Sequence, residues 1–194
     1  RPAPCSTASR CQASLPPRQR TAQGLAPLIE QQLNAVGWRP SDIQLVAVTQ
    51  GPGSFTGLRV GCVTAKTLAY ATGAAVLGVD TMAVLAFPIR VDKPRLSVVL
   101  DAQRSQLFAA QFQMDERGNW QVVQPTRIID NDAWLATLSA DMAVTGSGLA
   151  KLQTRVPPTV TIVDSSLWEP TAGAVAALAW REFLAGRRDD LWTL

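Results

Sequence analysis

Residues 43–80 form the stretch of the chain that most narrows the choice of fold. Residues 43–49 are apolar and rich in β-branched side chains, as expected of a short buried strand. A glycine-rich loop follows, and residues 58–71 have the pattern of a helix that leads to a second apolar strand at residues 75–79. A strand, a helix and a second strand in this order form a βαβ unit with parallel strands. The sequence therefore predicts an α/β fold.

The rest of the chain continues the alternation of helices and strands. Residues 2–18 are rich in Pro, Ser, Arg and Gln, which is typical of a loop or a frayed edge hairpin. The further predicted elements are helices at residues 21–36, 81–87, 130–138 and 171–185, an antiparallel meander at 96–100, 106–114 and 120–123, and a strand at 142–145. We therefore expect two lobes, an N-terminal one of residues 1–90 and a C-terminal one of residues 91–194.

Histidine is absent from all 194 residues, and this absence restricts the possible chemistry. It excludes a Ser-His-Asp triad, a Cys-His dyad and a histidine-bound metal, although a carboxylate- or lysine-based enzyme remains possible. The 3 cysteines are irregularly spaced, which favours reduced thiols over a disulfide framework. A net charge of +3 is too small to predict nucleic-acid binding, and no apolar run is long enough to span a membrane. We expect a cytoplasmic protein without a metal.

The glycine loop at residues 51–57 is the sharpest local signal. Gly51 and Gly53 allow a tight turn after the strand, and Ser54 or Thr56 can cap the helix that follows. Because N–H groups at the start of a helix can bind an anion, these four residues are candidates for a nucleotide or anion loop. The loop does not match the Walker sequence or the dinucleotide fingerprint. A plain strand-to-helix turn is the alternative, and both interpretations stay open.

Small residues recur at every fourth position of the helix after this loop. Such a stripe allows another backbone to approach closely, either that of the protein's own sheet or that of a helix in another subunit. The subunit alternative predicts a partner interface formed by Leu25, Leu28, Ile29, Gly57, Leu58, Gly61, Ala65 and Ala69.

The other candidate residues have plainer explanations. Asp101 and Arg104 lie in one predicted hairpin, where an ion pair between them is favoured over a catalytic role. Asp189 and Asp190 are expected to be a solvated pair of charges. The 6 tryptophans are scattered along the chain, which favours anchors in the core or in an interface over a platform for stacking bases.

The sequence GPGSFTGLRVG, residues 51–61, resembles the central signature of the TsaB/YeaZ family. Residues 20–29 and 76–81 agree with the same family in order, residues 99–108 resemble its Asp-Ala-Arg hairpin, and residues 145–148 resemble its second glycine turn. The resemblance covers about residues 20–192 and is strongest before residue 110.

This resemblance implies an actin-like, sugar-kinase-like ATPase fold of the ribonuclease H type, with two lobes. The family opens with a strand that carries Asp-Thr or Asp-Ser and tends to end with a Pro-x-Tyr-Leu-Arg strand. Neither is found here, so we expect lobes that lack the first and the last strand. Gly146 and Gly148 of the second glycine turn would join the candidate nucleotide or anion loop, and ATP or ADP is a possible ligand at the partner interface.

The resemblance also implies a function. The family supports TsaD, the transferase that places threonylcarbamoyl groups on the adenosine next to the anticodon of tRNA. TsaD binds its metal with a His-x-x-x-His pair, and the matching positions here hold Thr81 and Leu85, which cannot replace imidazole. We therefore expect a non-catalytic subunit that binds TsaD and, through it, a TsaE-like ATPase, with tRNA contacted only indirectly and a homodimer formed when the chain is alone. An M22-type peptidase homologue or a vestigial ATPase is the alternative.

Overall fold

The computed structural model describes residues 11–15 and 21–194 of the chain. The loop or frayed hairpin expected at residues 2–18 lies outside these residues except at 11–15, which have no regular structure. In chain order, the helices and strands are α1 (Thr21–Ala35), β1 (Leu45–Gly51), α2 (Phe55–Thr72), β2 (Ala75–Asp80), α3 (Thr81–Ala86), β3 (Arg95–Gln103), β4 (Gln106–Met114), β5 (Trp120–Asp130), α4 (Asn131–Leu135), β6 (Met142–Thr145), β7 (Thr161–Ile162) and α5 (Ala172–Leu184).

The chain divides into two compact units that do not follow each other along the sequence. The first unit comprises Arg1–Val48, Phe55–Gly78 and Ala179–Leu194, and the second comprises Thr49–Ser54 and Val79–Leu178. This division differs from the lobes expected at residues 1–90 and 91–194, because the last sixteen residues return to the first unit.

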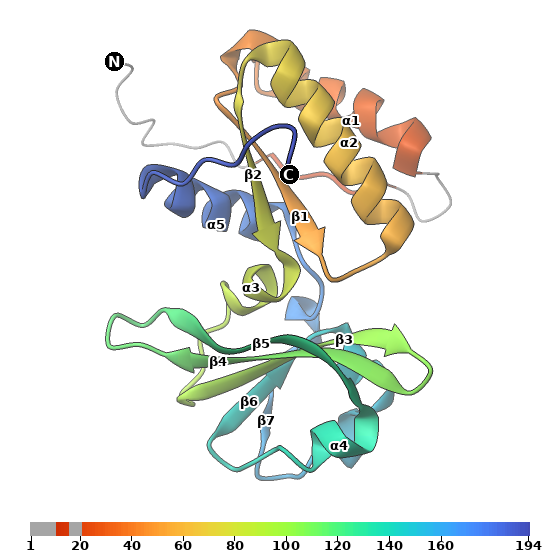
Figure 1. Cartoon of the computed structure of the whole chain (residues 1–194), viewed down its shortest axis with the longest axis vertical. Helices are drawn as coiled ribbons and strands as arrows, with labels where there is room; N and C mark the ends of the chain where they lie inside the picture. Colours follow the sequence, from red (N-terminus) through yellow and green to blue (C-terminus); the bar gives the residue numbers. More distant parts are fainter. Residues whose placement is uncertain (1–10, 16–20) are drawn as a thin grey trace. The chain divides into compact units, whose positions relative to one another are not determined.

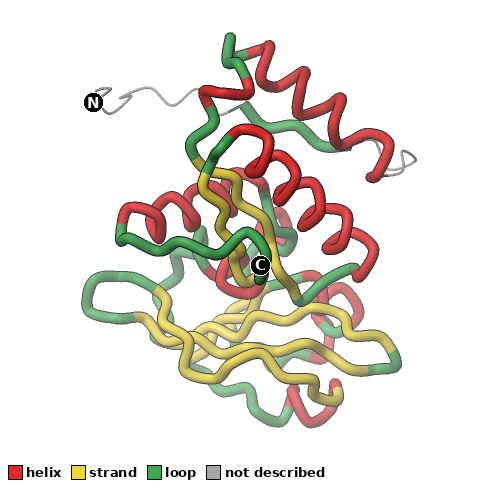
Figure 2. The backbone as a smooth tube through the Cα atoms, turned by 45° about the horizontal axis from the view of Figure 1, so that its top comes forward, coloured by secondary structure: helices red, strands yellow, loops and turns green. Residues whose placement is uncertain are grey.

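The first unit contains the predicted βαβ arrangement. Strands β1 and β2 pair in a two-stranded sheet and point in the same direction, with α2 as the connection between them (Figure 1). Helix α1 lies beside α2 (Figures 1 and 2). It ends before Gly37, whose φ of +70° suits a glycine at the end of a helix. The predicted helix at residues 21–36 is therefore confirmed.

Residues that follow α5 bind back onto strand β2. The backbone N–H of Asp189 donates to the carbonyl oxygen of Val76 at 3.4 Å, and the Asp189 carboxylate accepts from the backbone N–H of Gly78 at 2.8 Å. The guanidinium of Arg187 donates to the Gly78 carbonyl at 2.6 Å and pairs with the Asp189 carboxylate at 3.0 Å. The prediction of a solvated Asp189 was therefore wrong, because its carboxylate satisfies a buried backbone group of the sheet.

The second unit is built on a five-stranded mixed sheet with the strand order β5-β4-β3-β6-β7. Strands β3, β4 and β5 form the predicted antiparallel meander, while β6 and β7 run parallel to β3 (Figure 1). Strand β5 continues past the predicted residues 120–123 to Asp130 and contains Pro125. An edge strand tolerates proline because its outer N–H groups need no partner in the ladder.

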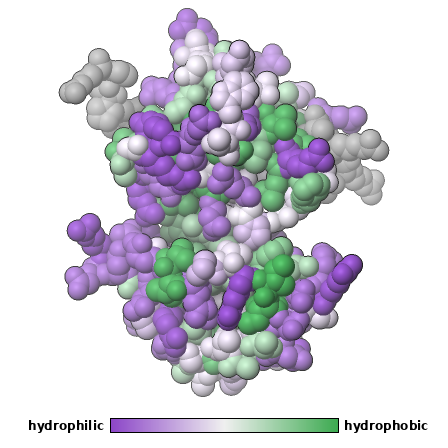
Figure 3. Space-filling model, viewed as in Figure 1, coloured by the Kyte–Doolittle hydropathy of each residue, from purple (hydrophilic) through white to green (hydrophobic). Residues whose placement is uncertain are grey.

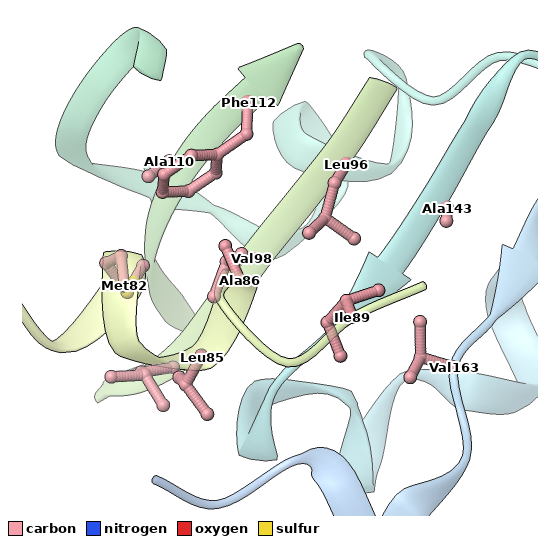
Figure 4. Close-up of a cluster of buried hydrophobic side chains, with 11 residues drawn as sticks. Met82, Leu85, Ala86, Ile89, Leu96, Val98, Ala110, Phe112, Ala143 and Val163 are labelled. Atoms are coloured by element: carbon pink, nitrogen blue, oxygen red, sulfur yellow. The ribbon is translucent and has the colours of Figure 1, made fainter. Parts of the chain in front are cut away.

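Strand β3 runs through the centre of the second unit and is buried on both faces. Val98 belongs to a cluster on one face that includes Phe112 of β4 and side chains of α3 (Figure 4). Val99 faces the other way and packs in a second cluster with Trp134 of α4. The buried hydroxyl of Ser97 accepts a hydrogen bond from the indole Nε1 of Trp134 at 3.0 Å, which accounts for a polar residue in this apolar strand.

Candidate functional site

Helix α2 presents its small residues to the interior of the first unit. Ala65 and Ala69 are 5% and 2% exposed, and a Cβ added to Gly61 would lie 3.4 Å from a methyl group of Val48 in β1. Gly57 is half-buried. Of the two alternatives for this stripe, packing within the protein's own unit therefore accounts for Ala65, Ala69 and Gly61 without a partner.

The opposite side of α2 carries large side chains that are exposed. Phe55, Val63 and Tyr70 are 73%, 64% and 72% exposed. Together with Arg59 and Lys66 they lie within an arc of roughly 80° at about 100° per residue. We call these five residues the outward face of α2. On the side seen in Figure 3, hydrophobic side chains alternate with hydrophilic ones over this helix.

The sequence prediction of an interface on α2 included the small residues and not the outward face. A signal was nevertheless present, since the large residues Phe55, Val63 and Tyr70 recur at a helical period on the side opposite to the stripe. Exposed apolar side chains that gather in a large patch mark contact sites on proteins, whereas single exposed apolar residues are ordinary.

Helix α1 contributes the other residues of the predicted partner interface. Leu25, Leu28 and Ile29 are half-buried, as is Leu58 of α2, and the two helices are in contact. These residues therefore lie at the boundary between the core of the unit and its surface. Their role in binding a partner stays a prediction.

The first glycine loop joins β1 to α2. Gly51 ends the strand with a φ of +118°, a conformation that favours glycine, and the bond between Gly51 and Pro52 is cis. Gly53, Ser54 and Thr56 are exposed where α2 begins. The turn itself explains the glycine at position 51, and anion binding by this loop stays a prediction.

The second glycine turn packs tightly against β3. Gly146 has a φ of +109° and a ψ of 157°, and an added Cβ would lie 2.1 Å from the carbonyl oxygen of Val99. At Gly148 an added Cβ would lie 2.8 Å from the side chain of Leu107. Close packing thus already accounts for both glycines, and their participation in a nucleotide or anion loop stays a prediction.

The tip of the β3–β4 hairpin has an unusual backbone. Gln103, Arg104 and Ser105 have φ values of 67°, 52° and 62°, which are uncommon for residues with a side chain. The ion pair expected between Asp101 and Arg104 is not formed, because Asp101 binds Lys151 at 2.9 Å instead. The Lys151 ammonium and the backbone N–H of Gln103 hold the pKa of the Asp101 carboxyl below its usual range.

Helix α3 contains the two residues that the family resemblance aligns with the metal ligands of TsaD. Thr81 and Leu85 are 5% and 1% exposed, and Asp80 caps the helix by accepting from the backbone N–H of Ala83 at 2.8 Å. Within residues 11–15 and 21–194, no group of three or more His, Cys, Asp or Glu side chains is placed to hold a metal ion. In the same described ranges, no helix is both long enough and apolar enough to cross a membrane.

Comparison with known proteins identifies relatives of this chain. The family model described as "TsaD: tRNA N6-adenosine threonylcarbamoyltransferase" matches residues 18–154. The chain is 33% identical over 106 residues to the tRNA threonylcarbamoyladenosine biosynthesis protein TsaB of Escherichia coli strain K12, covering 54% of this chain and 46% of the relative. It is 32% identical over 112 residues to TsaB of Bacillus subtilis strain 168, covering 58% and 48%. The chain thus spans about half the length of the curated relatives it matches.

Solved structures give the same relationship at the level of the fold. YeaZ from Pseudomonas aeruginosa aligns with a TM-score of 0.77 and 25% identity over 92% of this chain and 83% of that one. A P. aeruginosa protein described as similar to peptidase YEAZ aligns with a TM-score of 0.78 and 24% identity over the same shares.

The architecture and these structural matches define an actin-like α/β protein, as predicted. The chain belongs to the family that the TsaD model describes, and its TsaB and YeaZ relatives confirm the TsaB/YeaZ resemblance.

Proposed function

We propose that this chain is a non-catalytic subunit that binds TsaD and supports threonylcarbamoyl transfer to the adenosine next to the anticodon of tRNA. Its similarity to two TsaB proteins whose names state threonylcarbamoyladenosine biosynthesis is the observation that carries this proposal. In this scheme a separate synthase makes threonylcarbamoyl-adenylate, TsaD transfers the threonylcarbamoyl group, and a TsaE-like ATPase resets the complex. The chain contacts tRNA only through TsaD.

The surface proposed for binding TsaD is formed by helices α1 and α2. The exposed Phe55, Val63 and Tyr70 support this choice, because exposed apolar side chains that gather on one face of a helix are a feature of contact sites between proteins. The half-buried Leu25 and Leu28 of α1 would extend the contact. The same helices would serve a homodimer that competes with TsaD, and ATP or ADP is a proposed ligand at this interface.

Association with TsaD provides the direct test of the proposal. We expect the full-length protein to co-purify with TsaD of the same organism. We also expect a deletion strain to lose threonylcarbamoyladenosine from its tRNA, as measured by mass spectrometry of tRNA nucleosides, and a plasmid copy of the gene to restore the modification. Normal tRNA modification in a clean deletion strain would contradict the proposed function.

The absence of catalysis is tested separately. Because the chain has no histidine and Thr81 and Leu85 occupy the positions of the TsaD ligands, we expect the purified protein to contain no stoichiometric iron or zinc and to leave glycoproteins intact. Elemental analysis and a cleavage assay measure both, with TsaD from the same organism as the metal-containing control. Metal-dependent proteolysis that persists through exhaustive purification would favour the M22-type peptidase instead.

A further inference from the structure

We propose that helix α5 packs against α5 of a second copy of the chain in an antiparallel, two-fold contact. This contact goes beyond the proposed function, because it does not use helices α1 and α2, which are assigned to TsaD. The part of α5 that belongs to the first unit lies on the side of β1 and β2 away from α2 (Figures 1 and 2). One chain can therefore bind TsaD and a second copy at the same time.

An exposed apolar stripe runs along α5 at every fourth position. Its members are Ala172, Ala176, Trp180 and Leu184. Trp180 and Leu184 are 44% and 68% exposed, whereas Leu178 on the inward side of the helix is 2% exposed. Because α5 is one continuous helix, the spacing along the stripe is set by helix geometry. Rows of residues four apart are the ridges that most often interdigitate when two helices pack, so the stripe is a packing ridge that the chain leaves open to solvent.

The order of side-chain sizes along the stripe favours a second copy as the occupant. Two alanines, at positions 172 and 176, are followed by the large residues Trp180 and Leu184. In an antiparallel pair with its two-fold axis near residue 178, Trp180 lies opposite the partner's Ala176. Leu184 then lies opposite the partner's Ala172. Large side chains thus meet small ones along the whole contact, which is how facing helices fill the space between them.

Trp180, the largest residue of the stripe, is held in place by its neighbours. Its ring stacks on that of Phe183, with centroids 5.4 Å apart and planes inclined by 20°. The guanidinium of Arg188 lies over the Phe183 ring, 3.5 Å from its centroid, and donates to the carbonyl oxygens of Phe183 at 2.7 Å and Arg187 at 2.6 Å. Because a side chain that is already ordered loses less entropy on binding, this stack prepares Trp180 to act as the anchor of the contact.

The charges at the two ends of α5 are compatible with an antiparallel pair. Three arginines and three carboxylates balance at the C-terminal end: Arg181, Arg187, Arg188, Glu182, Asp189 and Asp190. Arg187 pairs with Glu182 and Asp189, and the Asp190 carboxylate accepts from two backbone N–H groups of its own turn. At the other end, the exposed Glu169 comes just before the helix. The antiparallel register brings Arg188 close to the partner's Glu169, so opposite charges meet at both ends of the contact.

Self-association is tested in full-length protein that carries Val63→Arg, because this change places a charge on the outward face of α2 and opposes any dimer formed there. We expect this parent protein to form a reversible dimer in sedimentation velocity, since one pair of helices makes a small interface. Ala176→Arg and Trp180→Ala should each weaken the dimer by tenfold or more. Glu169→Arg should weaken it severalfold, and adding Arg188→Glu to that variant should restore most of the loss. Thermal melting verifies that each variant is folded.

Two matched controls make the same substitutions away from α5. Ala133→Arg adds the same side chain at an exposed position of α4, and Arg117→Glu reverses a charge in the β4–β5 turn. Both should dimerise as the parent does. A parent protein that stays monomeric at every concentration would overturn the inference, as would an Ala176→Arg variant whose dimer affinity lies within twofold of the parent's.

A second measurement uses TsaD of the same organism with the chain unchanged at position 63. We expect light scattering to give a complex with two copies of each protein, and Ala176→Arg to reduce it to one copy of each. A wild-type complex with one copy of each, or a Trp180→Ala variant that loses TsaD binding and keeps self-association, would also overturn the inference. If TsaD does not bind, the proposed function fails, and the sedimentation experiment still decides whether α5 forms the self-contact.

Discussion

Replacing Gly146 by alanine should destabilise the second unit by several kcal/mol. The φ and ψ values of Gly146, +109° and 157°, lie in a region populated almost only by glycine, where another residue costs about 1–3 kcal/mol. The added Cβ would also lie 2.1 Å from the carbonyl oxygen of Val99 in the central strand, and forced overpacking costs about 1–3 kcal/mol more. Thermal melting should show a fall in Tm of about 10 °C or more, or the variant should be recovered as insoluble protein.

A second glycine of the same unit provides the control for backbone conformation. Gly118 has a φ of +74°, but an added Cβ there meets no atom within 4 Å. Gly118→Ala should therefore lower the stability of the protein only by the cost of placing alanine in a left-handed backbone conformation, about 1–2 kcal/mol. Equal losses of stability in the two variants would show that the tight packing at Gly146 contributes nothing beyond its backbone angles.

Replacing Ala65 by arginine should unfold the first unit. Ala65 is 5% exposed on the inward side of α2, so the variant would bring a guanidinium into the core without a counter-ion. An unpaired buried charge costs on the order of several kcal/mol, comparable with the whole stability of a small domain. Circular dichroism and the soluble yield measure the effect.

The matched variant lies two residues away on the same helix. Val63 is 64% exposed, so Val63→Arg should give a soluble protein with a Tm close to that of the wild type. A folded Ala65→Arg variant that still melts like the wild type would contradict the inward orientation of the small residues. The small residues of α2 would then again be candidates for a contact with another subunit.

Elements with a strong local pattern were predicted well from the sequence. Strand β4 and strand β6 have the bounds that their alternation and their flanking turns predicted. Strand β7, with only Thr161 and Ile162, was missed because two residues carry no periodicity, and it exists through pairing with β6. The helix expected at residues 130–138 ends at Leu135. After it, the backbone N–H groups of Thr137 and Leu138 donate to the carbonyl oxygens of Trp134 and Leu135, so the chain continues in tighter turns that are not α-helical.

The candidate site was predicted less completely, since its residues are joined by contacts across the chain. A stripe of small residues indicates close approach, but a helix and a sheet can each supply the approaching backbone, so the sequence left the direction of Ala65 open. The pairing of Asp101 with Lys151 spans fifty residues, and the contact of Tyr70 with Trp192 spans more than a hundred. No local pattern predicts such pairs, because they depend on how the elements are arranged in three dimensions.

The return of residues 179–194 to the first unit has a consequence for the order of events during synthesis. All residues of the second unit have been added to the chain before Ala179, so that unit is complete in sequence before the last sixteen residues of the first unit follow. The first unit can be completed only after residues 187 and 189 have been added. The bonds from Arg187 and Asp189 to Gly78 close a loop of more than a hundred residues. Closing so long a loop is slow when its interior is disordered, and a unit that has already folded between the two ends shortens the flexible path between them.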